Sequence, residues 1–114
     1  MELSYLDYGD LRVIKAEEER IDAAVAIQFK DRMRELTDAA TGRVLLDLSR
    51  VGFLDSSGLG AVVAAYKQLG PDRKLELAGL TATVDKVFKL TRMDSVFTIH
   101  ASADDVTAGL ADAG

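Results

Sequence analysis

The chain contains no cysteine, only one histidine and only one proline. The absence of cysteine excludes a disulfide framework, a thiolate zinc site, an iron–sulfur cluster and a cysteine nucleophile. Because His100 is the only imidazole, a histidine-rich metal site and a two-histidine mechanism are also excluded. No apolar run approaches the ~18 residues of a membrane span, and the first turns lack the basic start of a signal peptide. We therefore expect a soluble, cytoplasmic domain that needs no cofactor or metal and does not insert into a membrane.

The chain has 114 residues, of which 48% are hydrophobic and 29% charged, and its formal net charge is −5. This length and composition fit one globular domain over residues 1–114. The acidic balance argues against a nucleic-acid partner, because phosphate binding depends on clustered Lys and Arg. The charge is uneven: residues 58–95 carry a basic excess, and the rest of the chain is acidic, including the run Glu17–Glu19. Such a run is typical of a solvated turn.

Two short apolar runs around Gly9-Asp10 predict a β-hairpin at the start of the chain. From Asp22, an expected N-cap, the apolar spacing becomes helical until Gly42, an expected stop. Further strands are expected at 44–48, 75–78 and 96–99, and further helices at 59–69, at 83–91 and after Ser102. This ββαβαβαβα order predicts an α/β domain with a mixed, mostly parallel sheet and about four helices.

The segment Phe53–Ala61 follows a buried strand and opens a helix, where α/β folds place their functional loops. Asp55, Ser56 and Ser57 stand there with two glycines, at the positive end of the helix dipole, which favours an anionic group. A P-loop needs a lysine after its second glycine, and a dinucleotide-binding loop needs a third glycine. The segment has neither, so a nucleotide-hydrolysing or dinucleotide-binding site is not expected.

An enzyme is not expected either. A nucleophilic serine would need a base, and the only imidazole, His100, lies far downstream beside a predicted strand. Asp22, Asp47 and Asp55 could converge at the strand ends and bind a metal. Capping of the two helices explains Asp22 and Asp55 more simply.

Two interpretations of the serines remain open. Asp55-Ser56-Ser57 can simply cap the helix, or a serine can be the substrate of a kinase. A phosphate adds a charge of about −1.5 to −2, which a helix N-terminus tolerates without unfolding. The helix that follows is apolar almost all round, and full burial of an outer helix is hard to arrange in so small a domain. We therefore expect a docking face of small residues beside the serines.

The run Val44–Leu48, followed by Val51 and Phe53–Ala61, resembles the signature of STAS domains. It is most similar to the bacterial anti-sigma factor antagonists, also called anti-anti-sigma factors. The similarity extends over nearly the whole chain, and its most specific part is the D-S-S-G-L-G core. The chain departs from the family pattern at Glu19, where glycine is frequent, and at Val25, where threonine is frequent.

The resemblance implies a cytoplasmic phosphoprotein that regulates transcription by partner switching. The serine before the first glycine of the motif would be phosphorylated, which is Ser57 here, with Ser56 as the second choice. The kinase would be the partner itself, an anti-sigma factor with serine kinase activity. The unphosphorylated protein, a monomer when free, would sequester this partner and release a sigma factor, and a serine/threonine phosphatase would restore it. The expected partner-binding residues are Asp55, Ser56, Ser57, Gly58, Leu59, Gly60, Asp22, Val62 and Tyr66.

A related class of STAS domains serves as accessory subunits of ABC-type lipid transport systems. A transporter subunit is therefore the alternative function, and it predicts binding to an ABC ATPase that is indifferent to phosphorylation.

Overall fold

The hairpin expected around Gly9-Asp10 forms one side of the main sheet. β1 (Leu3–Tyr8) and β2 (Leu11–Ala16) pair antiparallel over their full lengths. The tight turn between them needs a left-handed residue, which Gly9 supplies with φ +62°. The computed structural model describes residues 1–110, so residues 111–114 of the expected domain lie outside it.

Three parallel strands extend the sheet beyond β2. They are β4 (Val44–Asp47), β6 (Leu75–Ala78) and β7 (Thr98–His100), and the strand order is β1-β2-β4-β6-β7. A short parallel pair, β3 (Arg20–Ile21) and β5 (Phe53–Leu54), forms a second small sheet. Within residues 1–110 the fold is thus a mixed, mostly parallel five-stranded sheet with four α-helices, which confirms the predicted fold class.

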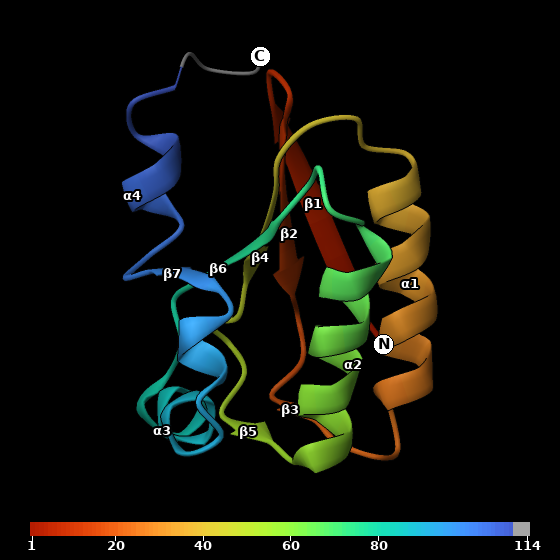
Figure 1. Cartoon of the computed structure of the whole chain (residues 1–114), viewed down its shortest axis with the longest axis vertical. Coiled ribbons are helices and arrows are strands. Elements are labelled where there is room, and N and C mark those ends of the chain that lie inside the picture. Colours follow the sequence, from red (N-terminus) through yellow and green to blue (C-terminus); the bar gives the residue numbers. More distant parts are fainter. Residues whose placement is uncertain (111–114) are drawn as a thin grey trace.

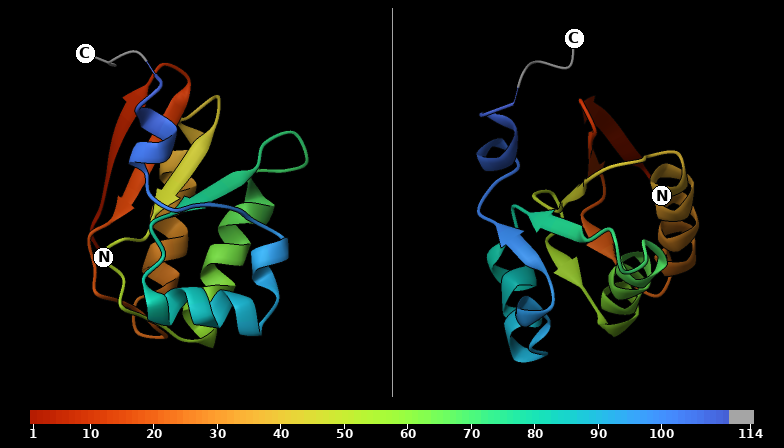
Figure 2. Two further views of the ribbon diagram at one scale, coloured as in Figure 1. Left: turned by 90° about the vertical axis from the view of Figure 1, so that its left-hand side faces the viewer. Right: turned by 45° about the horizontal axis from the view of Figure 1, so that its top comes forward.

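The helices divide between the two faces of the main sheet. α1 (Ala26–Asp38) and α2 (Ser56–Gln68) lie side by side on one face, and the short α4 (Asp104–Thr107) lies on the other (Figure 1). α3 (Ala82–Leu90) and the 3-10 turn η1 (Met93–Ser95) connect β6 to β7, as two further views show (Figure 2). The main core includes residues of α1, α2 and α3, whereas a smaller cluster packs against α4: Leu11, Leu45 and Ala78.

Three elements begin two or three residues from the expected position, and α1 also ends at Asp38, before the expected stop at Gly42. α1 begins at Ala26, because the Asp22 carboxylate accepts the N–H of Ala24 at 3.1 Å and holds a separate turn before the helix. Asp22 is therefore not the N-cap of α1. α2 begins earlier than expected, at Ser56, so the serines belong to its first turn. β7 begins only at Thr98, because η1 occupies the chain before it.

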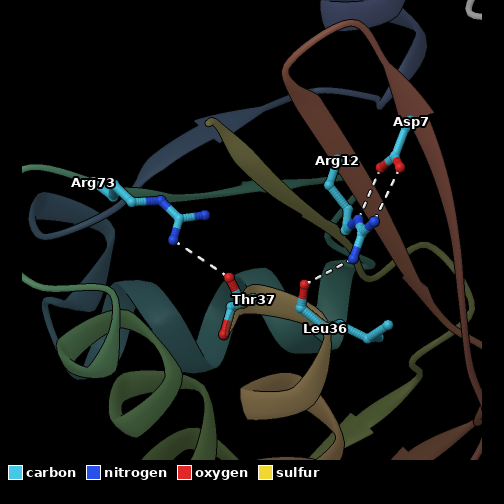
Figure 3. A network of polar contacts seen from close by, with 5 residues as sticks. All are labelled: Asp7, Arg12, Leu36, Thr37 and Arg73. Carbon is cyan, nitrogen blue, oxygen red and sulfur yellow. Dashed lines mark hydrogen bonds and ion pairs between the residues drawn. The ribbon is translucent and has the colours of Figure 1, made fainter. Parts of the chain in front are cut away.

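Two arginines from outside α1 stabilise its C-terminus, whose last turn has no basic residue of its own. Arg12 on β2 donates to the carbonyl of Leu36 at 3.0 Å, and Arg73 donates to that of Thr37 at 3.3 Å (Figure 3). The Arg12 guanidinium also forms a two-point ion pair with Asp7 on β1, at 2.8 and 3.0 Å. Cations at a helix C-terminus satisfy free carbonyls and complement the helix dipole. These contacts fasten α1 to the hairpin and to the loop before β6.

A polar cluster on the sheet joins the last two strands. Glu76 on β6 accepts two hydrogen bonds from Arg43, at 2.8 and 3.0 Å, and its Oε1 lies 2.9 Å from Nε2 of His100 on β7. The hydrogen bonds from Arg43 hold the pKa of Glu76 below its ordinary value of 4.5; burial opposes them and His100 adds to them. The one histidine of the chain is thus engaged in a structural contact.

This lowered pKa predicts how stability depends on pH. A carboxylate whose pKa is depressed by folding stabilises the fold above its unfolded pKa, and this contribution is lost as the pH falls through the folded pKa. We expect Glu76→Gln to be less stable than the wild type at pH 7, with a difference that shrinks as the pH is lowered to about 3. Thermal unfolding of both proteins between these pH values measures it. A difference that stays constant over the whole range would contradict the assignment.

Candidate functional site

The candidate site forms where two distant segments of the chain run side by side. β3 pairs with β5 in parallel, with Arg20 opposite Phe53 and Ile21 opposite Leu54. The turn that follows β3 therefore lies next to the start of α2, which follows β5. Figure 1 shows this junction at the end of the molecule opposite the β1–β2 turn.

Asp55 joins the two segments. Its backbone is extended, with φ −95° and ψ −174°, and its Oδ1 accepts the N–H of Gly58 at 2.8 Å, which makes it the N-cap of α2. Its Oδ2 accepts the N–H of Ala23 at 3.2 Å. One carboxylate thus caps the helix and fixes the turn between β3 and α1, so the predicted capping role of Asp55 is confirmed.

Gly58 allows α2 to approach β3 closely. It is buried, and a Cβ at this position would collide with the carbonyl oxygen of Ile21. The same atom would lie 2.9 Å from both the carbonyl carbon of Ile21 and Cδ1 of Leu54. A glycine is therefore required by packing, although its backbone is helical.

Ser56 and Ser57 occupy the first turn of α2, and both are exposed. Further along the helix, Gly60 and Lys67 are exposed on its outer side, and Ala64 is half-buried between them. Because Gly60, Ala64 and Lys67 are three or four residues apart, they lie on one side of the helix, in line with the serines. Beyond the serines, Gly60 is the only residue of α2 that is both small and exposed, so the docking face of small residues stays a prediction.

Two of the expected partner-binding residues are not available to a partner. The Val62 side chain is fully buried, and Gly58 lies against Ile21. α2 packs against α1 as well as β3 and β5, and this explains its apolar composition. As expected, the helix is not fully buried, because Ser57, Gly60 and Lys67 stay exposed on its outer side. Leu59 is half-buried against the core, and Tyr66 is half-buried with its ring edge-on to Phe97, the centroids 5.1 Å apart.

Asp22 lies at the edge of the site. Its side chain is 26% exposed, and its Oδ2 lies 3.4 Å from Nε of Arg20. The Arg20 guanidinium covers the ring of Phe53 at 4.2 Å from the centroid, and Phe53 is itself 37% exposed. Arg20 and the exposed Ala23 thus lie at this junction with Phe53 and Asp55, although neither was expected there from the sequence. The short β3–β5 pair that gathers them has too few residues to show a periodic pattern.

An open, acidic hollow of about 510 Å³ adjoins Asp22. Glu17 in this hollow pairs with Arg50 at 3.7 Å, while Glu19 is exposed. The backbone carbonyl of Glu19 accepts the N–H groups of Gly52 and Phe53, so its role at this junction does not depend on its side chain. The hollow is lined by Glu17, Glu18, Glu19, Arg20, Asp22, Ala24, Val25 and Arg50.

The three carboxylates considered for metal binding, Asp22, Asp47 and Asp55, do not assemble a metal site. Within residues 1–110, no group of three or more His, Asp or Glu side chains is placed to hold a metal ion. Asp22 and Asp55 meet at the junction, but both bind backbone N–H groups there. Asp47 instead accepts the N–H of Ser49 at 2.9 Å, at the end of β4.

None of the helices in the described part of the chain is long and apolar enough to cross a membrane.

The fold and the site together define a known class of domain. It has a five-stranded mixed sheet and a short strand pair that leads into a capped helix with two serines. The model of the STAS domain matches residues 4–106, and the chain belongs to the STAS domain family.

Several proteins similar to this chain are named anti-sigma factor antagonists. An anti-sigma-B factor antagonist from Listeria monocytogenes is 35% identical over 81 residues, which cover 69% of this chain and 70% of the relative. The crystal structure of an anti-sigma factor antagonist from Mycobacterium paratuberculosis superposes with a TM-score of 0.84 at 22% identity, covering 97% of this chain and 94% of the other. The Bacillus cell fate determinant SpoIIAA in its phosphorylated form has a TM-score of 0.67 at 20% identity, covering 94% and 96%.

Proposed function

We propose that this protein is a phosphorylation-controlled anti-sigma factor antagonist. In the unphosphorylated form it binds an anti-sigma factor that has serine kinase activity, and a sigma factor is thereby released. The partner phosphorylates Ser57 and so ends the complex, and a serine/threonine phosphatase restores the binding form. The protein acts as a binding module and kinase substrate in the cytoplasm, and not as an enzyme.

The observation that carries this proposal is the exposure of Ser57 in the first turn of a helix whose cap is fixed. A kinase can reach the hydroxyl without unfolding the helix, because Asp55 holds the cap through Gly58 at 2.8 Å. The modified residue would remain at the positive end of the helix dipole, which tolerates negative charge. Phosphorylation would therefore change the surface and leave the fold intact.

The charge around Ser57 explains how phosphate would act on a partner. Asp55 and Asp22 place carboxylates near the serines, although Asp22 pairs with Arg20, and Glu17 in the adjoining hollow pairs with Arg50. A phosphate adds about −1.5 to −2 to this surface. Because the partner is proposed to be the kinase, its nucleotide must lie beside this contact, and the phosphate on Ser57 would repel the nucleotide phosphates and would also have to be desolvated.

The relatives support the same function. The Listeria relative is named an anti-sigma-B factor antagonist, and SpoIIAA has been solved in a phosphorylated form, so members of this fold are phosphorylated. This favours the function of an anti-sigma factor antagonist over the alternative, in which this protein is an accessory subunit of a lipid transporter.

Phosphopeptide mapping tests the assignment of the serine. The purified protein is incubated with ATP and its cognate anti-sigma kinase, and the labelled peptide is sequenced by mass spectrometry. We expect phosphate on Ser57, retention of labelling in Ser56→Ala and its loss in Ser57→Ala. Unchanged labelling of Ser57→Ala would exclude Ser57, and the absence of any labelled serine would exclude the kinase-substrate mechanism.

A further inference from the structure

One edge of the main sheet, β1, presents free backbone groups. The N–H of Glu17 donates to the carbonyl of Glu2, and the N–H of Arg12 donates away from β1 to the carbonyl of Arg43. In an antiparallel pair of strands, residue pairs that exchange hydrogen bonds alternate with pairs that do not. Since Glu2 bonds to Glu17, the even-numbered residues of β1 are the ones that bond to β2. The N–H and C=O groups of the odd-numbered residues therefore point outward: Leu3, Tyr5 and Asp7.

β1 lacks the features that usually protect an edge strand. Such edges are commonly short, bulged, or interrupted by lysine or proline. β1 runs for six residues, Leu3–Tyr8, in unbroken register and contains no lysine, arginine, proline or glycine. The opposite edge, β7, is only three residues long and is therefore a poor template for pairing.

The side chains of β1 also expose apolar surface. Tyr5 is 46% exposed and Leu6 is 65% exposed, on opposite faces of the strand. Between residues 1 and 110 no backbone group is bonded to the outward side of β1, and the described strand order ends there. The edge is thus open in both its backbone and its side chains.

We propose that β1 pairs with β1 of a second copy of this chain, antiparallel and centred on Tyr5. Opposite residues of an antiparallel pair must lie on the same face, and only residues with outward groups can exchange hydrogen bonds. Centring on Tyr5 is the one register in which all three outward residues pair, with Tyr5 opposite Tyr5 and Leu3 opposite Asp7 of the second copy. The two sheets then join into one continuous sheet around a two-fold axis.

The charges on β1 favour this self-pairing. The one charged residue, Asp7, is already neutralised by its two-point ion pair with Arg12. In the register centred on Tyr5, Asp7 faces Leu3, whereas centring on Asp7 would place two carboxylates opposite each other. The interface is small compared with the ~1,200 Å² or more of a stable dimer, so the pairing is expected to be weak and concentration-dependent.

The pairing is independent of the proposed function, because no residue of the serine site lies on β1. A dimer joined in this way leaves Ser56, Ser57 and Gly60 on elements outside the paired strands. Its failure would therefore leave the kinase-substrate proposal untouched.

The absence of cysteine makes a cross-linking test simple. In the register centred on Tyr5, residue 5 of one copy faces residue 5 of the other at a Cα separation of about 5.5 Å, within disulfide range. Residue 6 faces residue 4, so the two residues 6 are diagonal neighbours at ~7–8 Å, beyond that range. Leu6→Cys is thus a matched control on the same strand, and it replaces a more exposed side chain than Tyr5→Cys does.

Both variants are checked for folding by circular dichroism and oxidised mildly at equal concentration. We expect Tyr5→Cys to form a covalent dimer at least tenfold faster than Leu6→Cys. We also expect the sedimentation mass of the wild type to rise from 12.3 kDa toward twice that value as its concentration approaches about 1 mM. Equal or reversed cross-linking rates, or a wild-type mass that stays monomeric throughout, would overturn the proposal.

Discussion

Gly58→Ala is expected to lower the free energy of unfolding by roughly 2–4 kcal/mol. The added methyl group would collide with the backbone carbonyl of Ile21, and it would lie 2.9 Å from Cδ1 of Leu54. A backbone group in a paired strand cannot turn aside as a flexible side chain can. The start of α2 would have to move away from β3, and the hydrogen bond from Ala23 to Asp55 would lengthen or break. Urea or thermal unfolding measures the loss.

Gly60→Ala is the matched control, two positions further along the same helix. A Cβ at Gly60 meets no atom within 4 Å, and the residue is exposed. Alanine is the better helix former, so this variant should gain about 0.5–1 kcal/mol of stability. The two substitutions are thus expected to have opposite signs. If both substitutions changed the free energy of unfolding equally, the close approach of α2 to β3 would not be the reason for a glycine at position 58.

The second large effect is expected on binding. Ser57→Asp adds a negative charge where the serine is proposed to face the phosphates of the partner's nucleotide, and we expect it to weaken binding of the anti-sigma factor at least tenfold. Ser57→Ala removes a hydroxyl and adds no charge, so it should keep the affinity within a factor of about three. Titration calorimetry with the purified partner measures both.

Ser56→Asp is the control for position. It adds the same charge one residue earlier in the same exposed turn. A weaker effect than that of Ser57→Asp is expected, because the proposal places the contact with the partner at Ser57. If Ser57→Asp and Ser57→Ala bound equally well, electrostatic repulsion would not be the basis of the switch.

The sequence was sufficient to predict the main sheet and its helices, because their signals are local and periodic. The Gly9-Asp10 turn between apolar runs indicated the hairpin, and the spacing of Phe29, Met33 and Leu36 indicated α1. All three of these α1 residues are buried. Asp55 before a glycine-containing helix start was sufficient to predict the cap, since capping depends on residues three positions apart.

The contacts between distant segments could not be predicted in the same way. β3 and β5 each have two residues, and nothing local in Arg20 or Phe53 indicates that they pair. Without knowledge of that pair, Gly58 and Val62 were expected to bind a partner, whereas both are buried. The start of α1 was misplaced for a related reason: Asp22 does cap backbone N–H groups, but those of a turn before the helix.

The central claim is that phosphate on Ser57 ends the complex with the anti-sigma factor. The most direct test is to prepare the protein in its unmodified and Ser57-phosphorylated forms and to measure the dissociation constant of each with the same nucleotide-bound partner. A phosphorylated form that binds at least tenfold more weakly, with an unchanged circular dichroism spectrum, is the predicted result. Equal dissociation constants for the two forms would contradict it.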